Sequence, residues 1–317
     1  MSHAALSIPL ARHLLDRDAD ARARPGLVDA LLADDATRLI ALRHGKALLT
    51  ETVDGSTPTL ARLRPGAVPS AEQYIYLGRS TDDGDAGTAI LAALLSDEQA
   101  SAVEPEELRW QGLRQAAPLL DDADAGLFGE VLAIANWHDS HGFCPRCGTA
   151  TEPRLAGWVR YCPKDRIDIF PRTDPAVIVL ITDDDDRVLL GSNASWQPGR
   201  FSLLAGFVEP GESLEHAVVR EMKEEAGIDV VEPRYRGSQP WPFPASIMLG
   251  FTARLSPTAA PADLQPDGTE IIDLRWFTRD ELGSAGPDVV LPGAASIARA
   301  LLEDWYGGPI DDGEGRW

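Results

Sequence analysis

One segment constrains the fold more than any other, and it occupies residues 206–228 with the sequence GFVEPGESLEHAVVREMKEEAGI. Its Pro-Gly pair predicts a tight turn. Ser213 is a good helix N-cap and Gly227 a good helix stop, so the segment predicts a helix over residues 214–226. The side chains expected to pack inward are Ala217, Val218 and Met222.

The same helix carries a crowded acidic face. Glu221, Glu224 and Glu225 stand at positions i, i+3 and i+4, so their carboxylates share one side of the helix and repel one another. A divalent cation such as Mg²⁺ or Mn²⁺ would remove the repulsion and still bind substrate phosphates. Arg220 and Glu212 are spaced to pair across the loop and the helix. The alternative is an ordinary solvated helix with charge pairs.

The whole segment resembles the Nudix box: glycine, five residues, glutamate, seven residues, Arg-Glu, an apolar residue, any residue, Glu-Glu, any residue, glycine, apolar. The resemblance implies an α/β/α sandwich and hydrolysis of a nucleoside diphosphate linked to another group. It implies Mg²⁺ or Mn²⁺ ions held by Glu221, Glu224 and Glu225, with Glu225 favoured as the base and Glu224 as its rival. Glu270, just before a strand expected at Ile271–Phe277, is the fourth carboxylate that the resemblance suggests.

A second motif follows the box, where residues 238–246 read SQPWPFPAS. Three prolines flank two aromatic residues, so the segment is stiff. From the residues alone, it is either a stacking wall for a planar base or a rigid loop whose aromatics fill the core. It resembles the SQPWPFPxS signature of NADH pyrophosphatases. That family cleaves NADH or NAD to NMN(H) and AMP, and some bacterial members remove NAD caps from RNA.

The resemblance also implies a binding pocket and an assembly. Phe207 and Trp241 would hold the nicotinamide between them. The other residues implied to line the pocket are Phe170, Ile178, Ser246, Met248 and Ala298. A homodimer is implied as well, in which the Trp241 segment completes the partner's site.

A small cysteine module precedes the box. Cys144-Pro-Arg-Cys147 and Cys162-Pro-Lys-Asp165 have the spacing of a four-cysteine zinc ribbon, with aspartate as the last ligand. A carboxylate oxygen can bind zinc, so a structural Zn²⁺ site with three cysteines and Asp165 is feasible. A ribbon without metal is the alternative. Two nearby residues could instead supply the fourth ligand, namely His138 and His141.

The order of these motifs predicts the domain organisation. A Nudix α/β/α sandwich is preceded by a zinc-ribbon module and a mixed α/β domain that is structural or dimerising. In sequence order we expect that domain at 1–125, a linker helix and zinc ribbon at 126–170, the Nudix domain at 171–305 and a mobile acidic tail at 306–317. Strands are expected at 176–181 and 187–191, and the aspartate-rich turn between them is interpreted as a solvated hairpin tip, not a metal site.

Composition narrows the functional classes. The formal net charge of −21 opposes a broad nucleic-acid footprint, although a pocket alone could bind an RNA cap. The three cysteines favour the reducing cytoplasm, and no apolar run predicts a membrane span. Two rivals to an NAD(H) pyrophosphatase remain. The motif at Trp241 argues against a Nudix hydrolase for ADP-ribose, and the three glutamates argue against a non-catalytic zinc-ribbon module.

Overall fold

The computed structural model describes residues 6–11, 15–50, 57–284 and 288–311. The chain forms two compact units: a C-terminal unit of residues 1–11, 174–240 and 246–317, and an N-terminal unit of residues 12–173 and 241–245. The chain therefore passes from the C-terminal unit into the N-terminal unit for five residues, which include Trp241, and then returns. In the described part of the chain, no helix combines the length and apolarity needed to cross a membrane.

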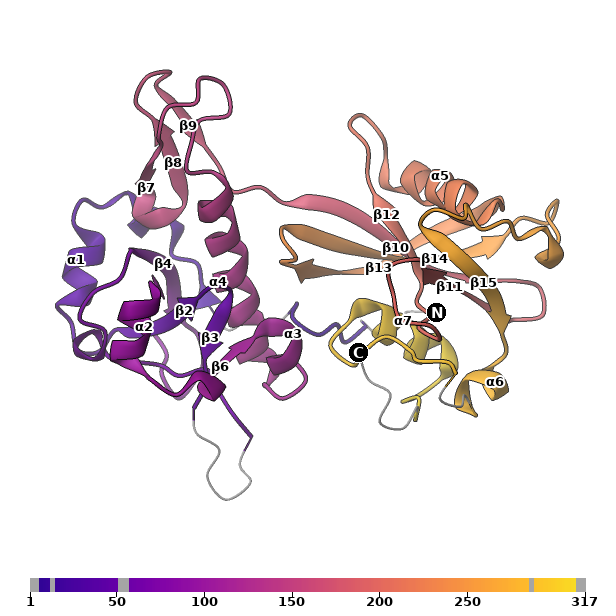
Figure 1. Cartoon of the computed structure of the whole chain (residues 1–317), viewed down its shortest axis with the longest axis horizontal. Coiled ribbons are helices and arrows are strands. Elements are labelled where there is room, and N and C mark those ends of the chain that lie inside the picture. The colour runs from indigo at the N-terminus through magenta and orange to yellow at the C-terminus, as the bar shows by residue number, and fades with distance from the viewer. Residues whose placement is uncertain (1–5, 12–14, 51–56, 285–287, 312–317) are drawn as a thin grey trace. The chain divides into compact units, whose positions relative to one another are not determined.

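The N-terminal unit is built on a six-stranded mixed sheet of order β1-β4-β5-β2-β3-β6, in which β2 and β5 are parallel and the other pairs antiparallel (Figure 1). The strands are β1 (Leu15–Asp16), β2 (Arg38–Arg43), β3 (Lys46–Leu48), β4 (Gln73–Ser80), β5 (Ala89–Leu94) and β6 (Trp110–Gly112). The helices are α1 (Leu27–Leu32), α2 (Asp97–Val103), α3 (Leu113–Ala116) and α4 (Asp122–Ser140), with 3-10 turns η1 (Ala19–Ala23), η2 (Pro65–Ala67) and η3 (Glu107–Arg109).

Helix α4 is the longest element of this unit. Asp121 caps it, because its side chain accepts a hydrogen bond of 2.7 Å from the backbone N–H of Asp124. The helix is buried over most of its length, including the titratable residues Glu130 and His138. The linker helix expected from residue 126 is present, and it begins earlier, at Asp122.

A three-stranded antiparallel sheet follows α4 and forms the ribbon, with strands β7 (Glu152–Arg154), β8 (Val159–Cys162) and β9 (Ile167–Ile169) and the turn η4 (Leu155–Gly157). Its base is fixed to the mixed sheet. Trp158 donates its indole N–H to the carbonyl of Tyr76 at 2.6 Å, and a Cβ on Gly157 would lie 2.8 Å from Ile75. The ribbon is thus packed onto β4 of the same unit.

The C-terminal unit contains the second six-stranded sheet, of order β13-β14-β10-β11-β15, with β12 also paired to β10. Its strands are β10 (Asp174–Thr182), β11 (Val188–Asn193), β12 (Leu204–Phe207), β13 (Val230–Trp241), β14 (Ser246–Leu255) and β15 (Ile271–Phe277). Its helices are α5 (Leu214–Ala226), α6 (Arg279–Gly283) and α7 (Ile297–Tyr306), with the turn η5 (Pro261–Asp263).

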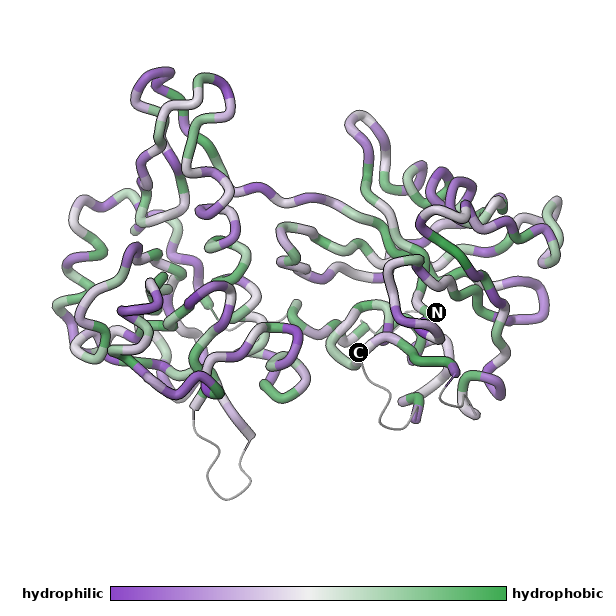
Figure 2. Tube along the Cα trace, viewed as in Figure 1, coloured by the Kyte–Doolittle hydropathy of each residue, from purple (hydrophilic) through white to green (hydrophobic). Residues whose placement is uncertain are grey.

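Strand β10 shows why this sheet is covered on both faces. Val177, Val179 and Ile181 belong to an apolar cluster with α5, whereas Ile178 and Leu180 belong to another with α7. Alternate side chains of a strand point to opposite faces, so a strand that is apolar throughout needs a cover on each side. Figure 2 shows the resulting hydrophobic run along the central strands. The predicted α/β/α sandwich is confirmed.

Local predictions in this unit are also confirmed. Helix α5 spans residues 214–226, as predicted. The Ser213 side chain accepts from the N–H of His216, and Gly227 ends the helix at φ 72°. The predicted inward residues, Ala217, Val218 and Met222, are fully buried.

The aspartate-rich turn is a hairpin tip between β10 and β11. The buried Asp183 accepts from the backbone N–H of Arg187, and Asp184 and Asp186 form ion pairs with Arg254 and Arg279. Each of these carboxylates binds a different partner, whereas a metal site would need them to converge on one ion. The interpretation as a hairpin tip agrees with this arrangement.

The segment predicted to be a mobile tail is packed as far as Ile310. Ile310 is buried, and the Arg299 guanidinium donates a hydrogen bond to its carbonyl oxygen. Residues 312–317 of that predicted tail lie outside the described residues.

Candidate active site and metal centre

Arg220 organises the acidic face of α5. Its guanidinium donates two hydrogen bonds of 2.9 Å to the Glu212 carboxylate, which confirms the pairing expected across loop and helix. It also donates to Glu221 and Glu224 at 2.9 Å each, and to the carbonyl of Phe207. These bonds hold the pKa of Glu212 down to about 2 and raise the pKa of Arg220. One cation therefore holds three carboxylates and the end of β12.

The Glu221 carboxylate packs against strand β12 at Gly206, the first residue of the box. A Cβ built on Gly206 would lie 1.9 Å from the carboxyl carbon of Glu221, so only glycine leaves space for this carboxylate. Glu221 is buried, and burial raises the pKa of its carboxyl group against the lowering effect of Arg220. Gly206, the first residue of the box, and Glu221 are therefore sterically coupled.

Glu225 is the most buried of the three glutamates on the acidic face of α5, with 5% of its surface exposed. Its Oε2 has no hydrogen-bond partner among the residues that the structure describes. Burial first, and then the charges of Glu221, Glu270 and Asp267, raise the pKa of Glu225 to about 8. A buried carboxylate oxygen without a partner is costly, so this position favours a proton or a cation.

Glu270 lies in an exposed turn before β15, and sequence reasoning missed the residue that shapes this turn. Asp267 accepts hydrogen bonds from the backbone N–H groups of Thr269, Glu270 and Ile271 at 2.8–3.0 Å. These bonds lower the pKa of Asp267 and fix the backbone that carries Glu270. The sequence signal is the Pro-Asp-Gly turn at residues 266–268.

The donor set of this face fits a hard divalent cation. All candidates are carboxylates, Oε2 of Glu225 is buried with no partner among the residues described, and Gly206 leaves space around Glu221. The carboxylates are not gathered around one point, because Glu224 is exposed and turned to Arg220. Among the described residues, only the cysteine module brings three or more potential ligand atoms within 4.8 Å of one another.

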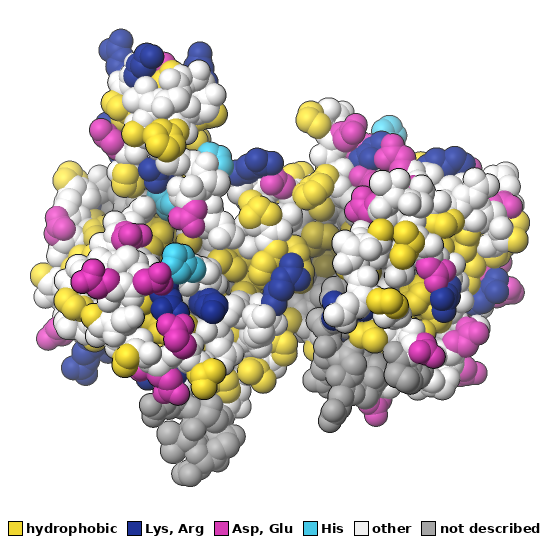
Figure 3. Space-filling view, viewed as in Figure 1, with side chains coloured by type: hydrophobic (Ala, Val, Ile, Leu, Met, Phe, Trp, Pro, Cys, Tyr) yellow, Lys and Arg dark blue, Asp and Glu magenta, His cyan; other side chains and the backbone are white. Residues whose placement is uncertain are grey.

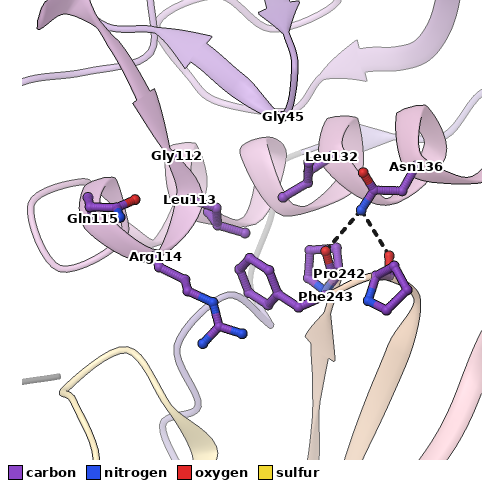
Figure 4. Close-up of a pocket in the computed structure, with 10 residues that line it drawn as sticks. Gly45, Gly112, Leu113, Arg114, Gln115, Leu132, Asn136, Pro242 and Phe243 are labelled. Atoms are coloured by element: carbon purple, nitrogen blue, oxygen red, sulfur yellow. Dashed lines mark hydrogen bonds between the residues drawn. The ribbon is translucent and has the colours of Figure 1, made fainter. Parts of the chain in front are cut away.

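The aromatic motif folds against helices α3 and α4 within the N-terminal unit. Asn136 of α4 donates its side-chain N–H groups to the carbonyls of Pro242 and Pro244, at 3.0 and 2.9 Å (Figure 4). The rings of Trp241 and Phe243 meet edge to face, 5.0 Å apart. The motif is therefore fixed at its prolines and presents a rigid aromatic pair.

A cavity of about 350 Å³ lies between this motif and helices α3 and α4. The Arg114 guanidinium lies 4.0 Å from the centre of the Phe243 ring and 5.1 Å from that of Trp241. Burial lowers the pKa of Arg114. The sequence prediction missed both Asn136 and Arg114. The sequence offered a signal for Asn136, which is a polar residue within the mostly apolar helix α4. It offered none for Arg114, which belongs to no motif.

The other predicted pocket residues fall into two groups. Ile178, Met248 and Ala298 meet in one apolar cluster of the C-terminal unit, and Ser246 is buried at the start of β14. Phe207 and Phe170 are 60% and 65% exposed. Phe207 belongs to the C-terminal unit, and Phe170 and Trp241 belong to the N-terminal unit.

Gln239 of the motif is a residue whose role the sequence prediction missed. It is fully buried, donates to the carbonyls of Pro9 and Ala295, and accepts from the backbone N–H of Ile297 at 2.8 Å. It thereby ties β13 to the start of α7, the helix that carries Ala298. The sequence did indicate this residue, because glutamine is a fixed position of the SQPWPFPxS motif.

The cysteine module brings its four predicted ligands together. One ligand atom from each of Cys144, Cys147, Cys162 and Asp165 lies within 4.8 Å of the others. Cys147 Sγ and Cys162 Sγ are 3.5 Å apart, and Cys144 Sγ is 3.6 Å from Asp165 Oδ2. Three thiol sulfurs and a carboxylate oxygen suit a structural zinc ion. Asp165 would supply the fourth ligand of such an ion.

Neither nearby histidine belongs to this group. The Arg160 guanidinium donates to Nδ1 of His138, whose Nε2 then donates to the carbonyl of Gly157 at 2.8 Å. Burial lowers the pKa of His138 to about 4. His141 Nδ1 contacts Ser140 and the carbonyl of Trp137. The alternative fourth ligands are therefore engaged elsewhere, and His138 is a neutral structural residue.

The comparisons with known proteins divide the chain into three segments. Residues 172–301 match the NUDIX domain, residues 139–170 the NADH pyrophosphatase zinc ribbon domain, and residues 36–137 the NADH pyrophosphatase-like rudimentary NUDIX domain.

Individual proteins are similar over much of the chain. The NAD-capped RNA hydrolase NudC of Mycobacterium bovis is 39% identical over 304 residues, which cover 92% of this chain and 89% of that protein. The protein of the same name from Stutzerimonas stutzeri is 43% identical over 62% of this chain and 67% of its own length. A crystal structure of a NUDIX hydrolase from Nitrosomonas europaea is 26% identical and covers 53% of this chain and 94% of that one, with a TM-score of 0.41.

Proposed function

Because the chain belongs to the Nudix hydrolases of the NADH pyrophosphatase and NAD-capped RNA hydrolase family, we propose that it hydrolyses the pyrophosphate of NADH and NAD. One water is added, one P–O bond of the bridge breaks, and the products are NMN(H) and AMP. The same cleavage at the 5′ end of an NAD-capped RNA leaves a 5′-monophosphate. The observation that carries the hydrolase assignment is the buried Oε2 of Glu225, which has no hydrogen-bond partner within the described part of the chain and feels the charge of Glu221.

The carboxylates of α5 would hold the Mg²⁺ or Mn²⁺ ions that the substrate needs. Glu221, Glu224 and Glu225 are the proposed ligands, with Glu270 as a fourth. When bound, such ions neutralise the pyrophosphate and lower the pKa of a water molecule. This source of positive charge matters because both the chain and its substrate are anionic.

The side chains have separate roles in this proposal. Arg220 holds Glu221 and Glu224 in position through its hydrogen bonds to both. Glu225 accepts the proton of the attacking water, with Glu224 as the alternative base. Gly206 keeps the Glu221 carboxylate close to strand β12.

The aromatic motif supplies the proposed specificity for the nicotinamide. Asn136 fixes the prolines around Phe243, so Trp241 is a rigid stacking wall. Phe207, exposed at the end of β12, is the proposed opposite wall. The proposed lining of the pocket consists of Phe170, Ile178, Ser246, Met248 and Ala298.

A substrate panel tests the proposal directly. Purified protein with Mg²⁺ or Mn²⁺ should hydrolyse NADH, NAD and NAD-capped RNA with a higher kcat/KM than ADP-ribose. Glu225→Gln and Glu224→Gln should each lower kcat on the order of 10³-fold, about 4 kcal/mol of transition-state stabilisation. Glu215→Gln, an exposed change on the same helix, should leave activity within about twofold of the parent. Higher kcat/KM for ADP-ribose would contradict the substrate assignment, and full activity in both active-site variants would contradict the mechanism.

We also propose a homodimer in a reducing, cytoplasmic compartment. The support for the compartment is the convergence of three free cysteines on one site, since a disulfide there would remove zinc ligands.

Light scattering would measure the oligomeric state of the proposed homodimer. Mixing Trp241→Ala with Glu225→Gln protein should restore partial activity if each site takes residues from both subunits.

A further inference from the structure

The two knuckles of the ribbon share one pattern of charge. They read Cys-Pro-Arg-Cys-Gly at residues 144–148 and Cys-Pro-Lys-Asp-Arg at residues 162–166. The third position is a cation in both, at Arg146 and Lys164. The only carboxylate in either knuckle is that of Asp165, which faces the cysteine sulfurs.

The fifth position of each knuckle needs a left-handed backbone. The two knuckles fold alike, because the N–H of Gly148 bonds to the carbonyl of Cys144 and the N–H of Arg166 bonds to that of Cys162, at 2.9 and 2.8 Å. Gly148 has φ 69°, and Arg166 has φ 55°. Glycine adopts this conformation freely, but a side chain there is strained. Arg166 therefore places a third cation where the backbone favours glycine.

These cations are not used by the fold. Arg146, Lys164 and Arg166 are exposed, and none forms an ion pair with any residue in the described part of the chain. In the sequence, Phe143 lies directly before the first knuckle, and its side chain is 69% exposed. Figure 3 shows Lys and Arg side chains at the tip of the ribbon, and in the same view acidic side chains are spread over both units, the ribbon included.

We propose that Arg146, Lys164 and Arg166, here called the knuckle cations, bind the phosphates of the RNA that follows an NAD cap, with Phe143 stacking on a base. The inference rests on the proposed function and extends it from the cap to the transcript. Single-stranded RNA suits this surface because it offers phosphates in series and unstacked bases. The net charge of −21 keeps the rest of the molecule from adding to the contact, so the RNA footprint is short and local.

Salt dependence gives the expected size of the effect. Each neutralised phosphate of a single strand contributes about −0.7 to the slope of log K against log salt, so three contacts give a slope of roughly −2. Binding of RNA should then weaken roughly 20-fold between 50 and 200 mM salt. The small substrate NADH has no strand to contact the ribbon, and its kcat/KM should not carry this slope.

The test compares two triple variants of the full-length protein. The knuckle variant carries Arg146→Gln, Lys164→Gln and Arg166→Gly. The control carries Arg24→Gln, Lys46→Gln and Arg64→Gln, which remove the same charge from exposed positions of the same unit. Fluorescence anisotropy with a labelled, uncapped single-stranded RNA measures binding, and hydrolysis of NADH and NAD-capped RNA measures activity. Zinc content is measured in each protein.

The knuckle variant should bind RNA at least tenfold more weakly and lose about two units of salt slope, with zinc content and NADH hydrolysis unchanged. Its kcat/KM for NAD-capped RNA should fall by a similar factor, and the control should match wild type. Equal losses in the two variants, an unchanged slope, or loss of zinc with loss of NADH hydrolysis would each overturn the proposal. Wild-type protein that binds RNA through the knuckle cations yet hydrolyses no dinucleotide would instead contradict the proposed function.

Discussion

Gly206 and Glu221 occupy complementary space: a Cβ on residue 206 would lie 2.2 Å from both carboxylate oxygens of residue 221. The atoms in conflict belong to the end of a flexible side chain and not to the backbone. Substitution at residue 206 should therefore move the carboxylate without unfolding the sheet. A substitution at residue 206 can therefore impair catalysis while the protein remains folded.

Gly206→Ala should lower kcat/KM for NADH on the order of 10²-fold, because the displaced Glu221 can no longer take its place in the metal site. The melting temperature should fall by only a few degrees, as expected for roughly 1 kcal/mol. Steady-state kinetics and thermal unfolding measure the two effects. Gly308→Ala, where an added Cβ meets nothing within 4 Å, is the matched control. An active Gly206→Ala enzyme would show that the position of Glu221 does not matter.

Asn136→Leu should lower kcat/KM for NADH by about tenfold, because the carbonyls of Pro242 and Pro244 lose their donor and the Trp241 wall loosens. Trp241→Ala should cost roughly 10–100-fold, the loss expected from one stacking wall. ADP-ribose, which lacks the nicotinamide, should be affected much less by either change. Asp139→Asn, an exposed change on the same helix, is the control. Equal losses for NADH and ADP-ribose would mean that the motif has only a structural role.

The protein should contain one zinc ion per chain when it is purified without chelator. Asp165→Ala should weaken zinc binding, and Asp165→Cys should strengthen it, because a thiolate is a softer and better ligand for zinc than a carboxylate. Metal analysis and competition with a chelator measure both effects. Asp168→Ala, on the exposed side of β9, should change neither. A zinc content near zero, with stability unaffected by chelator, would support a ribbon that has lost its metal.

His138 should make the N-terminal unit sensitive to acid. Burial holds its pKa at about 4, below the 6.5 of an unfolded chain, so the unfolded state binds the proton more readily. The free energy of unfolding contains the full contribution of neutral His138 above pH 6.5. This contribution is lost as the pH falls toward 4, by up to about 3 kcal/mol. His138→Gln should reduce this loss, whereas the exposed His216→Gln should not. Free energies of unfolding between pH 4.5 and 8 measure the difference, and parallel curves would contradict the assignment.

Glu130 should act in the opposite direction. Burial raises its pKa to about 7, against the opposing charges of Arg17 and Arg22, so the folded state binds the proton more tightly than the unfolded state. Its contribution is full below pH 4.5 and is lost as the pH rises to 7. Glu130→Gln should therefore gain up to about 3 kcal/mol on wild type between pH 4.5 and 8. The exposed Glu98→Gln should gain nothing, and a Glu130→Gln curve that follows wild type would rule out a buried, protonated carboxyl.

Sequence reasoning succeeded where the information is local. The cap at Ser213, the stop at Gly227 and the apolar spacing between them define α5 without any tertiary contact. It failed where the partners are far apart in the chain. Asn136 meets Pro242 and Pro244 across more than a hundred residues, and the stacking of Arg114 on Phe243 leaves no periodic pattern in the sequence. The raised pKa of Glu225 depends on burial under β12, which residue spacing does not encode.

The return of residues 241–245 to the N-terminal unit has a consequence for how the protein is made. A ribosome releases residues 12–173 long before it reaches Trp241, so the N-terminal unit is completed only after residues 174–240 of the C-terminal unit have been made. Until that short loop emerges, the Asn136 amide and the Arg114 guanidinium lack the partners that they meet in the finished protein. No single break in the gene divides this chain into two independent proteins, and the two units are therefore inherited as one.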